Sequence, residues 1–174
     1  MEYHIEELIS QETVEKKIGE LAEQLNRDYE GKELHLIVVL KGSVFFATEL
    51  AKRLTMPVTM DFMAVSSYGS GMVSAGEITV TKELDEDIEG KDVLIVEDIF
   101  DSGITLFNLR ILLLARNPKS LKIITLLDKK DNHNTEVPID YVGFEIPNKF
   151  VVGYGLDYAQ KHRNLPYIGV IVEN

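Results

Sequence analysis

Apolar and polar residues follow two different periods along the chain, and the change of period marks the predicted elements. Residues Thr13 to Tyr29 carry apolar side chains at helical spacing, with charged residues on the remaining face, which is typical of an amphipathic helix. Residues Leu34 to Leu40 form a continuous apolar run, which favours a strand buried on both faces of a parallel sheet. The pattern therefore predicts a helix followed by a buried strand.

Strands and helices continue to alternate through the middle of the chain. A helix is predicted from Ser43 to Leu54, and another from Gly103 to Arg116, which Asn117 and Pro118 close. Because this alternation is typical of parallel sheets, we expect an α/β fold with an open, mostly parallel twisted sheet flanked by helices. The other predicted strands are Pro57 to Ser66, Glu77 to Lys82, Val93 to Val96, Leu121 to Leu127, Tyr141 to Phe144, Phe150 to Tyr154 and Tyr167 to Val172.

Composition narrows the class of protein. The chain has 174 residues, 45% of them apolar, which suits one sizeable core, so a single domain over residues 1–174 is expected. It has no cysteine, which excludes disulfides and thiolate metal sites and fits a reducing compartment. No signal-peptide pattern opens the sequence, and no apolar run reaches the ~18 residues of a membrane span. A cytoplasmic location without a membrane partner is therefore expected.

The net charge bears on possible partners. The formal charge is −11, which argues against a nucleic-acid partner, because affinity for a phosphate backbone is carried by clustered lysine and arginine. Part of the acidity lies in the run from Lys82 to Asp87, which we interpret as a solvated turn.

The segment after the strand Val93 to Val96 is the most informative about chemistry. Ligands collect at the carboxyl ends of the strands of an open α/β sheet, and small residues before a helix leave backbone N–H groups free for a phosphate. Carboxylates there suit sugar hydroxyls, a hard cation or a proton in transfer. A ribose phosphate with Mg²⁺ accounts for these features; the alternative is an N-capping Ser102 behind a solvated acidic turn. The residues concerned are Glu97, Asp98, Asp101, Ser102, Gly103 and Thr105.

Four ordered segments resemble one enzyme family. Residues Val93 to Thr105 resemble the phosphoribosyl pyrophosphate signature of type I phosphoribosyltransferases. Leu40 to Ser43, Ser66 to Gly69 and Phe150 to Tyr158 resemble the hypoxanthine (guanine) branch of that family. The resemblance covers nearly the whole chain, and it implies the type I phosphoribosyltransferase fold with a small hood formed by C-terminal and N-terminal residues.

The resemblance also implies a reaction. The 5-phosphoribosyl group of phosphoribosyl pyrophosphate would pass to a 6-oxopurine base, hypoxanthine first and guanine next, giving IMP or GMP and pyrophosphate in purine salvage. Mg²⁺ is the cofactor that the family implies, and a homodimer or homotetramer is the implied assembly.

Matched position by position, the signature assigns the ribose and phosphate contacts. Glu97 and Asp98 would hold the ribose hydroxyls, directly or through Mg²⁺, and Asp157 would supply a further metal-binding carboxylate. Asp101 would also be the catalytic residue, a general base toward N7 of the purine. The 5′-phosphate would contact Asp101, Ser102, Gly103, Ile104 and Thr105.

The pyrophosphate and purine contacts come from other loops. Lys41, Gly42 and Arg163 would bind pyrophosphate, and the family implies a cis peptide bond between Leu40 and Lys41.

For the base, Lys129 would donate to the 6-oxo group, which excludes adenine because its amino group does not accept a hydrogen bond. Phe150 would stack on the ring, and the backbone of Val151 would contact the ring edge. Ser67 and Tyr68 would belong to a flexible loop that closes over the site.

Several alternatives stay open at this point. Without the resemblance, Phe150 and Val151 would be interpreted as core residues and Lys129 as a surface lysine. The stretch from Asp128 to Asn134 departs from the family pattern, which leaves the base preference open. A xanthine-preferring enzyme and a non-catalytic, nucleotide-sensing regulator with the same fold are the competing hypotheses.

Overall fold

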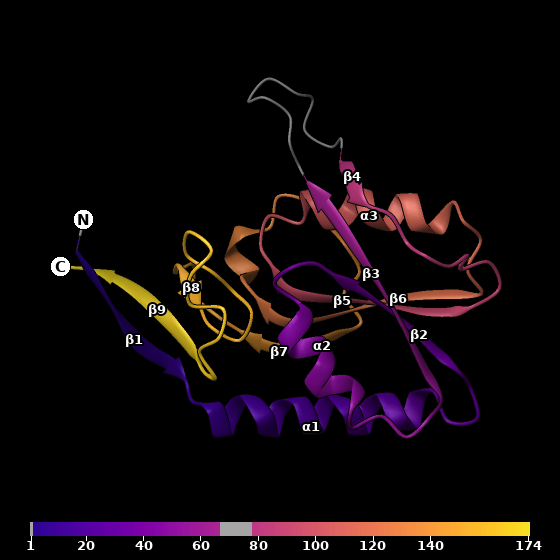
Figure 1. Ribbon diagram of the computed structural model, residues 1–174, viewed down its shortest axis with the longest axis horizontal. Coiled ribbons are helices and arrows are strands. Elements are labelled where there is room, and N and C mark those ends of the chain that lie inside the picture. The colour runs from indigo at the N-terminus through magenta and orange to yellow at the C-terminus, as the bar shows by residue number, and fades with distance from the viewer. Residues whose placement is uncertain (1, 67–77) are drawn as a thin grey trace.

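A six-stranded sheet forms the centre of the computed structural model, which describes residues 2–66 and 78–174 (Figure 1). Within these residues the strand order is β4-β3-β2-β5-β6-β7. Neighbouring strands are parallel, except that β4 pairs with β3 in the antiparallel direction. The prediction of a mostly parallel sheet is confirmed. The strands are β2 (Leu34–Val39), β3 (Val58–Ser66), β4 (Thr79–Lys82), β5 (Asp92–Phe100), β6 (Ser120–Asp128) and β7 (Tyr141–Glu145).

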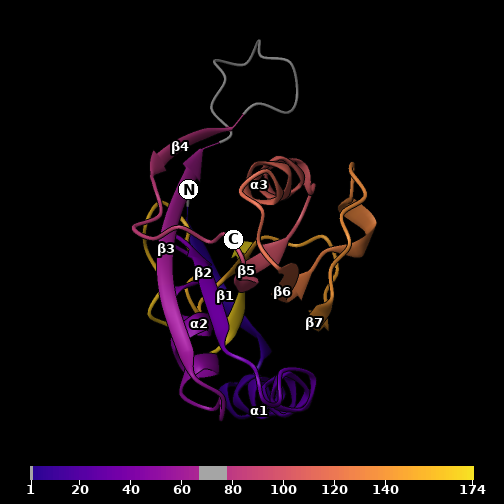
Figure 2. The same ribbon diagram turned by 90° about the vertical axis from the view of Figure 1, so that its right-hand side faces the viewer.

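Helices cover both faces of this sheet. Helices α1 (Gln11–Asp28) and α2 (Val44–Ala51) pack on one face and α3 (Ile104–Leu114) packs on the other (Figure 2). Successive residues of a strand point to opposite faces. Leu36 of β2 therefore packs with α1 and α2, whereas Ile37 packs with α3. A strand buried on both sides needs the continuous apolar run that the sequence shows.

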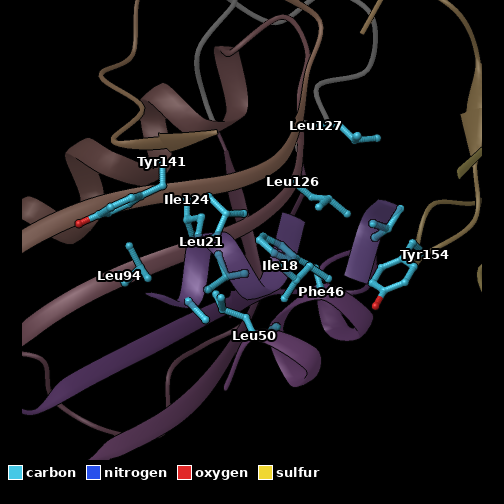
Figure 3. Packing of buried hydrophobic residues seen from close by; sticks show 14 of the residues in the cluster. Ile18, Leu21, Phe46, Leu50, Leu94, Ile124, Leu126, Leu127, Tyr141 and Tyr154 are labelled. Atoms are coloured by element: carbon cyan, nitrogen blue, oxygen red, sulfur yellow. The ribbon is translucent and has the colours of Figure 1, made fainter. Parts of the chain in front are cut away.

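The core on the α1 side is the larger one. Figure 3 shows Ile18 of α1 beside Phe46 and Leu50 of α2 in this cluster. All three side chains are fully buried, and burial of such a side chain contributes roughly 1.5–3 kcal/mol. This packing fixes α2, and with it the turn between β2 and α2.

A small antiparallel sheet joins the two ends of the chain. Its strands are β1 (Tyr3–Ile9), β9 (Ile168–Glu173) and β8 (Val151–Val152), in the order β1-β9-β8. The hood that the resemblance implied is therefore present. The apolar pattern predicts no strand before residue 13, however, and the strand predicted from Phe150 to Tyr154 is longer than β8. Residues after Val152 turn away because Gly153 and Tyr154 both have positive φ.

Three smaller predictions can be compared with the structure. The peptide bond between Leu40 and Lys41 is cis, as the family implied. Asp85 and Glu86 are exposed in a turn, but their backbone N–H groups donate to the buried carboxylate of Asp61 at 2.9 and 3.0 Å. Among the described residues, no helix is both long and apolar enough to cross a membrane.

Candidate active site

Three loops meet at the carboxyl ends of β2, β5 and β6, which are neighbours in the sheet. The loop after β2 reaches the end of β5, because Gly42 lies against the carboxylate of Asp98. The loop after β6 joins them through the backbone N–H of Lys129, which donates to the carbonyl of Phe100 at 2.9 Å. The carboxyl edge of the sheet therefore collects most of the residues that the sequence singled out.

Glu97 and Asp98 place two carboxylates at the end of β5. Burial, and next the charge of Asp98, raise the pKa of Glu97 well above its ordinary value. Burial likewise raises the pKa of Asp98 to about 6, against the lowering effects of a backbone hydrogen bond from Ile99 and the charge of Arg163. Burial of an anion without full compensation is costly. This pair is therefore suited to a cation or to hydroxyl donors.

Gly42 is required where it stands. A Cβ atom at this position would collide with the Asp98 carboxylate. The carbonyl of Gly42 is equally close to Gly155, since a Cβ there would lie 2.0 Å from it. Two glycines thus allow the loop after β2 to lie between the acid pair and the loop after β8.

The loop into α3 ends in a residue with left-handed backbone. Gly103 has φ 87° and is the N-cap of α3, and a Cβ there would lie 2.7 Å from the Phe100 ring. No side chain caps the helix at Gly103. Ser102 Oγ accepts only a long hydrogen bond, of 3.5 Å, from the N–H of Ile104. The N–H groups of the first turn have no intrahelical partner, so this helix start offers donors to an anion.

A cavity of about 220 Å³ lies over this loop. Its wall includes residues of β2 and β3 as well as of the loop itself. The carboxylates of Glu97 and Asp101 and the helix start therefore line the same space. The predicted phosphate-site residues that line it are Glu97, Asp101, Ser102, Gly103 and Thr105.

Asp101 has two side-chain partners from the loop after β6. Lys129 Nζ lies 3.6 Å from Asp101 Oδ2, and Asn132 Nδ2 donates to Asp101 Oδ1. Lys129 is only 9% exposed, so it is not the surface lysine that the sequence alone suggested. Sequence reasoning missed Asn132; the departure of its stretch from the family pattern was the one available signal.

A second group of charges surrounds Arg163. Its guanidinium donates to the carbonyl of Gly155 at 2.8 Å and to Gln160 Oε1 at 3.1 Å, and it lies 3.4 Å from Asp157 Oδ1. Lys41 Nζ also donates to Gln160 Oε1, at 3.4 Å. The structure thus brings together three predicted residues, Lys41, Asp157 and Arg163. Gln160, which connects them, was missed because its pattern in the sequence marks no site.

The residues predicted to contact the base differ in exposure. Phe150 is 52% exposed and meets the ring of Tyr158 edge-on, with centroids 5.4 Å apart. About half of this side chain is therefore open to contact with a ligand. Val151 is buried and pairs with Val170 of β9. Ser67 and Tyr68 lie outside the described residues.

Comparison with known proteins agrees with this geometry. The model of the phosphoribosyl transferase domain family matches residues 4–159. Hypoxanthine phosphoribosyltransferase of Haemophilus influenzae is 49% identical over 173 residues, which are 98% of this chain and 97% of the relative. Hypoxanthine-guanine phosphoribosyltransferase of Bacillus subtilis is 50% identical over 172 residues, 98% of this chain and 96% of the relative. The chain belongs to the hypoxanthine-guanine phosphoribosyltransferase family.

Solved structures of this family have the same fold. A hypoxanthine-guanine phosphoribosyltransferase from Bacillus anthracis superposes with a TM-score of 0.93 at 46% identity, over 98% of this chain and all 100% of that one. A hypoxanthine phosphoribosyltransferase from Staphylococcus aureus gives a TM-score of 0.92 at 47% identity, over 96% of this chain and 91% of that one.

Other members of the family are longer proteins. The bifunctional protein TilS/HprT of Listeria monocytogenes is 52% identical over 164 residues, which are 94% of this chain and 25% of the relative. The chain thus spans about a quarter of the length of the bifunctional Listeria relatives and nearly all of the single-function ones.

Proposed function

We propose that this chain transfers the 5-phosphoribosyl group of phosphoribosyl pyrophosphate to hypoxanthine or guanine, releasing pyrophosphate in purine salvage. The observation that supports this best is the shared cavity of the helix start and the carboxylates. An anion-binding helix start beside carboxylates suits a ribose phosphate and little else of similar size. The names of the relatives point to the same bases.

The 5′-phosphate would lie at the start of α3. Backbone N–H groups of Ile104 and Thr105 would donate to its oxygens, with the hydroxyls of Ser102 and Thr105. The positive end of the helix dipole favours the anion at this place. Because Gly103 takes a left-handed φ, the loop can turn its N–H groups toward one point.

Asp101 would act as general base toward N7 of the purine. Its Oδ2 lies near Lys129 Nζ, and N7 and the 6-oxo group are neighbours on one edge of a 6-oxopurine. A single edge could therefore meet both groups, with N7 on the carboxylate and the oxo group on the ammonium. Adenine would lack the acceptor that Lys129 needs.

The donors at the end of β5 fit Mg²⁺. Glu97 and Asp98 are hard oxygen donors whose burial raises their pKa values, so a divalent cation would offset the cost of their charges. Among the described residues, no three His, Cys, Asp or Glu side chains gather closely enough to hold a metal ion by themselves. Oxygens of the substrate and water would complete the shell, with Asp157 on the pyrophosphate side. The ion would neutralise the departing pyrophosphate.

The leaving group would bind beside Arg163. Lys41 and Arg163 already share Gln160 as acceptor, so both cations point to one region. Pyrophosphate oxygens would replace these internal acceptors, and the loop at Gly42 would leave room for them. On the other side of the ribose, Phe150 would stack on the base and the backbone of Val151 would meet its edge.

Product formation with four bases tests the proposal. The chain would be incubated with phosphoribosyl pyrophosphate and Mg²⁺ together with hypoxanthine, guanine, xanthine or adenine, and each reaction would be repeated with EDTA. We expect IMP and GMP to form, no AMP, and no product with EDTA. Turnover of xanthine above the other bases would support a xanthine-preferring enzyme, and binding without any turnover would support the regulator.

Assembly and location stay predictions. A homodimer or homotetramer is expected, and light scattering after size-exclusion chromatography that shows only monomer would contradict it. A cytoplasmic location would be tested by cell fractionation.

A further inference from the structure

The residues after β6 hold the loop that carries Asp101 from behind. In this backing segment, Lys129–Thr135, the backbone N–H groups of Asn134 and Thr135 donate to the carbonyl of Ser102 at 2.9 and 3.2 Å. The ring of His133 lies against Phe100, with centroids 4.0 Å apart. The backing segment and the loop before α3 are therefore fixed to each other by backbone contacts.

One side chain of the backing segment reaches the carboxylate itself. The 3₁₀ turn Lys130–Asn132 places Asn132 so that its Nδ2 donates to Asp101 Oδ1. The other carboxylate oxygen, Oδ2, faces Lys129 at the longer distance of 3.6 Å. Rotation of the carboxylate about its Cβ–Cγ bond would break the first contact. Asn132 thus fixes the plane of the carboxylate, so that the oxygen it does not hold stands next to Lys129.

We infer that Asn132 is a positioning residue for the reaction: it holds Oδ1 of Asp101 so that Oδ2 is presented to N7 of the purine. The inference rests on the proposed function, because it assigns the two oxygens of the proposed base different tasks. A neutral amide orients the carboxylate without placing a further positive charge beside it. The stretch that departs from the family pattern would thereby take a specific part in catalysis.

The test compares two substitutions on the same turn. Asn132→Leu keeps the shape of the side chain and removes the donor, whereas Asp131→Ala changes an exposed neighbour. For Asn132→Leu we expect kcat with hypoxanthine to fall by roughly 10- to 100-fold, the range found when a supporting partner of a functional group is lost. The KM for phosphoribosyl pyrophosphate should change less than about twofold, because Asn132 acts through a group that meets the base. Asp131→Ala should behave as the wild type.

A double-mutant cycle separates positioning from general support of the fold. If Asn132 acts through Asp101, Asn132→Leu should have almost no further effect on kcat in an Asp101→Asn background. The same fold-loss in both backgrounds, or an equal rise in KM for both substrates together with a lower melting temperature, would overturn the inference.

Two further outcomes are informative. If Asn132→Leu does not fold, Asn132→Ser, which keeps a short donor, is compared with Asn132→Ala; equal kcat values for the two would overturn the inference. A wild-type chain without turnover would reject the proposed function, whereas an active wild type with an equally active Asn132→Leu variant would reject only the role of Asn132.

Discussion

The two sides of the candidate site hold their charges differently. On the proposed ribose side, Glu97 and Asp98 are carboxylates whose pKa values are raised mainly by burial. On the pyrophosphate side, Asp157 already has Arg163 as a partner at 3.4 Å. On the first side, a cation that arrives with the substrate would offset the cost of the buried charges. On the second side, substrate oxygens would have to replace internal partners, so the binding energy there would be a difference between two sets of contacts.

The largest expected effect concerns Asp101, the group proposed to receive the proton. Asp101→Asn keeps the shape of the side chain, and its amide oxygen still accepts the hydrogen bond from Asn132. An amide cannot, however, accept the N7 proton. The kcat should fall by about 10² to 10⁴, as for loss of a general base, with little change in the KM for phosphoribosyl pyrophosphate. Steady-state kinetics with hypoxanthine measures both; unchanged kcat would remove Asp101 from the role.

The second largest effect is expected at Gly42, where the two sides of the candidate site touch. Gly42→Ala would push its Cβ against the Asp98 carboxylate, and a displacement of about 1 Å near the reacting atoms can cost 10²-fold in rate. We expect a loss of that order in kcat/KM. The matched control is Gly19→Ala on α1, where nothing lies within 4 Å of the added atom. That change should leave kinetics intact and stabilise the helix by about 0.5–1 kcal/mol.

A smaller effect should follow from Arg163→Lys. The guanidinium contacts Gly155, Gln160 and Asp157 at once, and a lysine ammonium cannot reproduce that fork. The KM for phosphoribosyl pyrophosphate should rise roughly 10-fold, with a weaker change in the KM for hypoxanthine. Lys161→Ala, an exposed cation on the same loop, serves as the control. An equal rise in the control would mean that net charge, and not the fork, matters.

The smallest effect concerns stability and pH. Because burial raises the pKa of Asp98 from 3.8 to about 6, the folded chain binds a proton more tightly than the unfolded chain. The free energy of unfolding should therefore decrease as the pH rises from about 4 to about 6, and stay lower above that window.

Removing the Asp98 charge checks this sign. Asp98→Asn should raise the melting temperature by a few degrees at pH 8 without Mg²⁺ and bring little gain at pH 4. Saturating Mg²⁺ and phosphoribosyl pyrophosphate should reverse the order of the two chains. If the wild type and Asp98→Asn melt at the same temperature at both pH values, burial does not destabilise the Asp98 carboxylate.

The sequence predicts the residues of the proposed ribose side better than the residues that hold Asp101 in place. The apolar run into Glu97 and Asp98 is a local pattern, and a buried strand followed by small residues and a helix leaves few other folds for it. Gly103 with its positive φ follows from the same local logic. The partner of Asp101 does not, because Asn132 reaches it through the register of β5 and β6 and not through any spacing in the chain.

Strand β1 was missed for a related reason. Its residues are half exposed and show no clean alternation of apolar and polar positions, so the period-2 signal is weak. It becomes a strand because β9, from the other end of the chain, pairs with it over Tyr3 to Ile9. The sequence likewise left open whether Lys129 is exposed or part of the site. Its burial depends on where β6 ends beneath the neighbouring loops.

The pairing of β1 with β9 has a consequence for the order of assembly. Tyr3 is opposite Glu173, and the backbone of Asn174 donates to Glu2 at 3.2 Å. During synthesis β1 leaves the ribosome long before its partner β9 has been made. Contacts between residues so distant in sequence form late. The central sheet and the loop before α3 can fold on a growing chain. Strand β8, which follows Phe150 directly, gains its neighbour β9 only after Ile168–Glu173 have been synthesised, so the proposed purine side forms later than the central sheet.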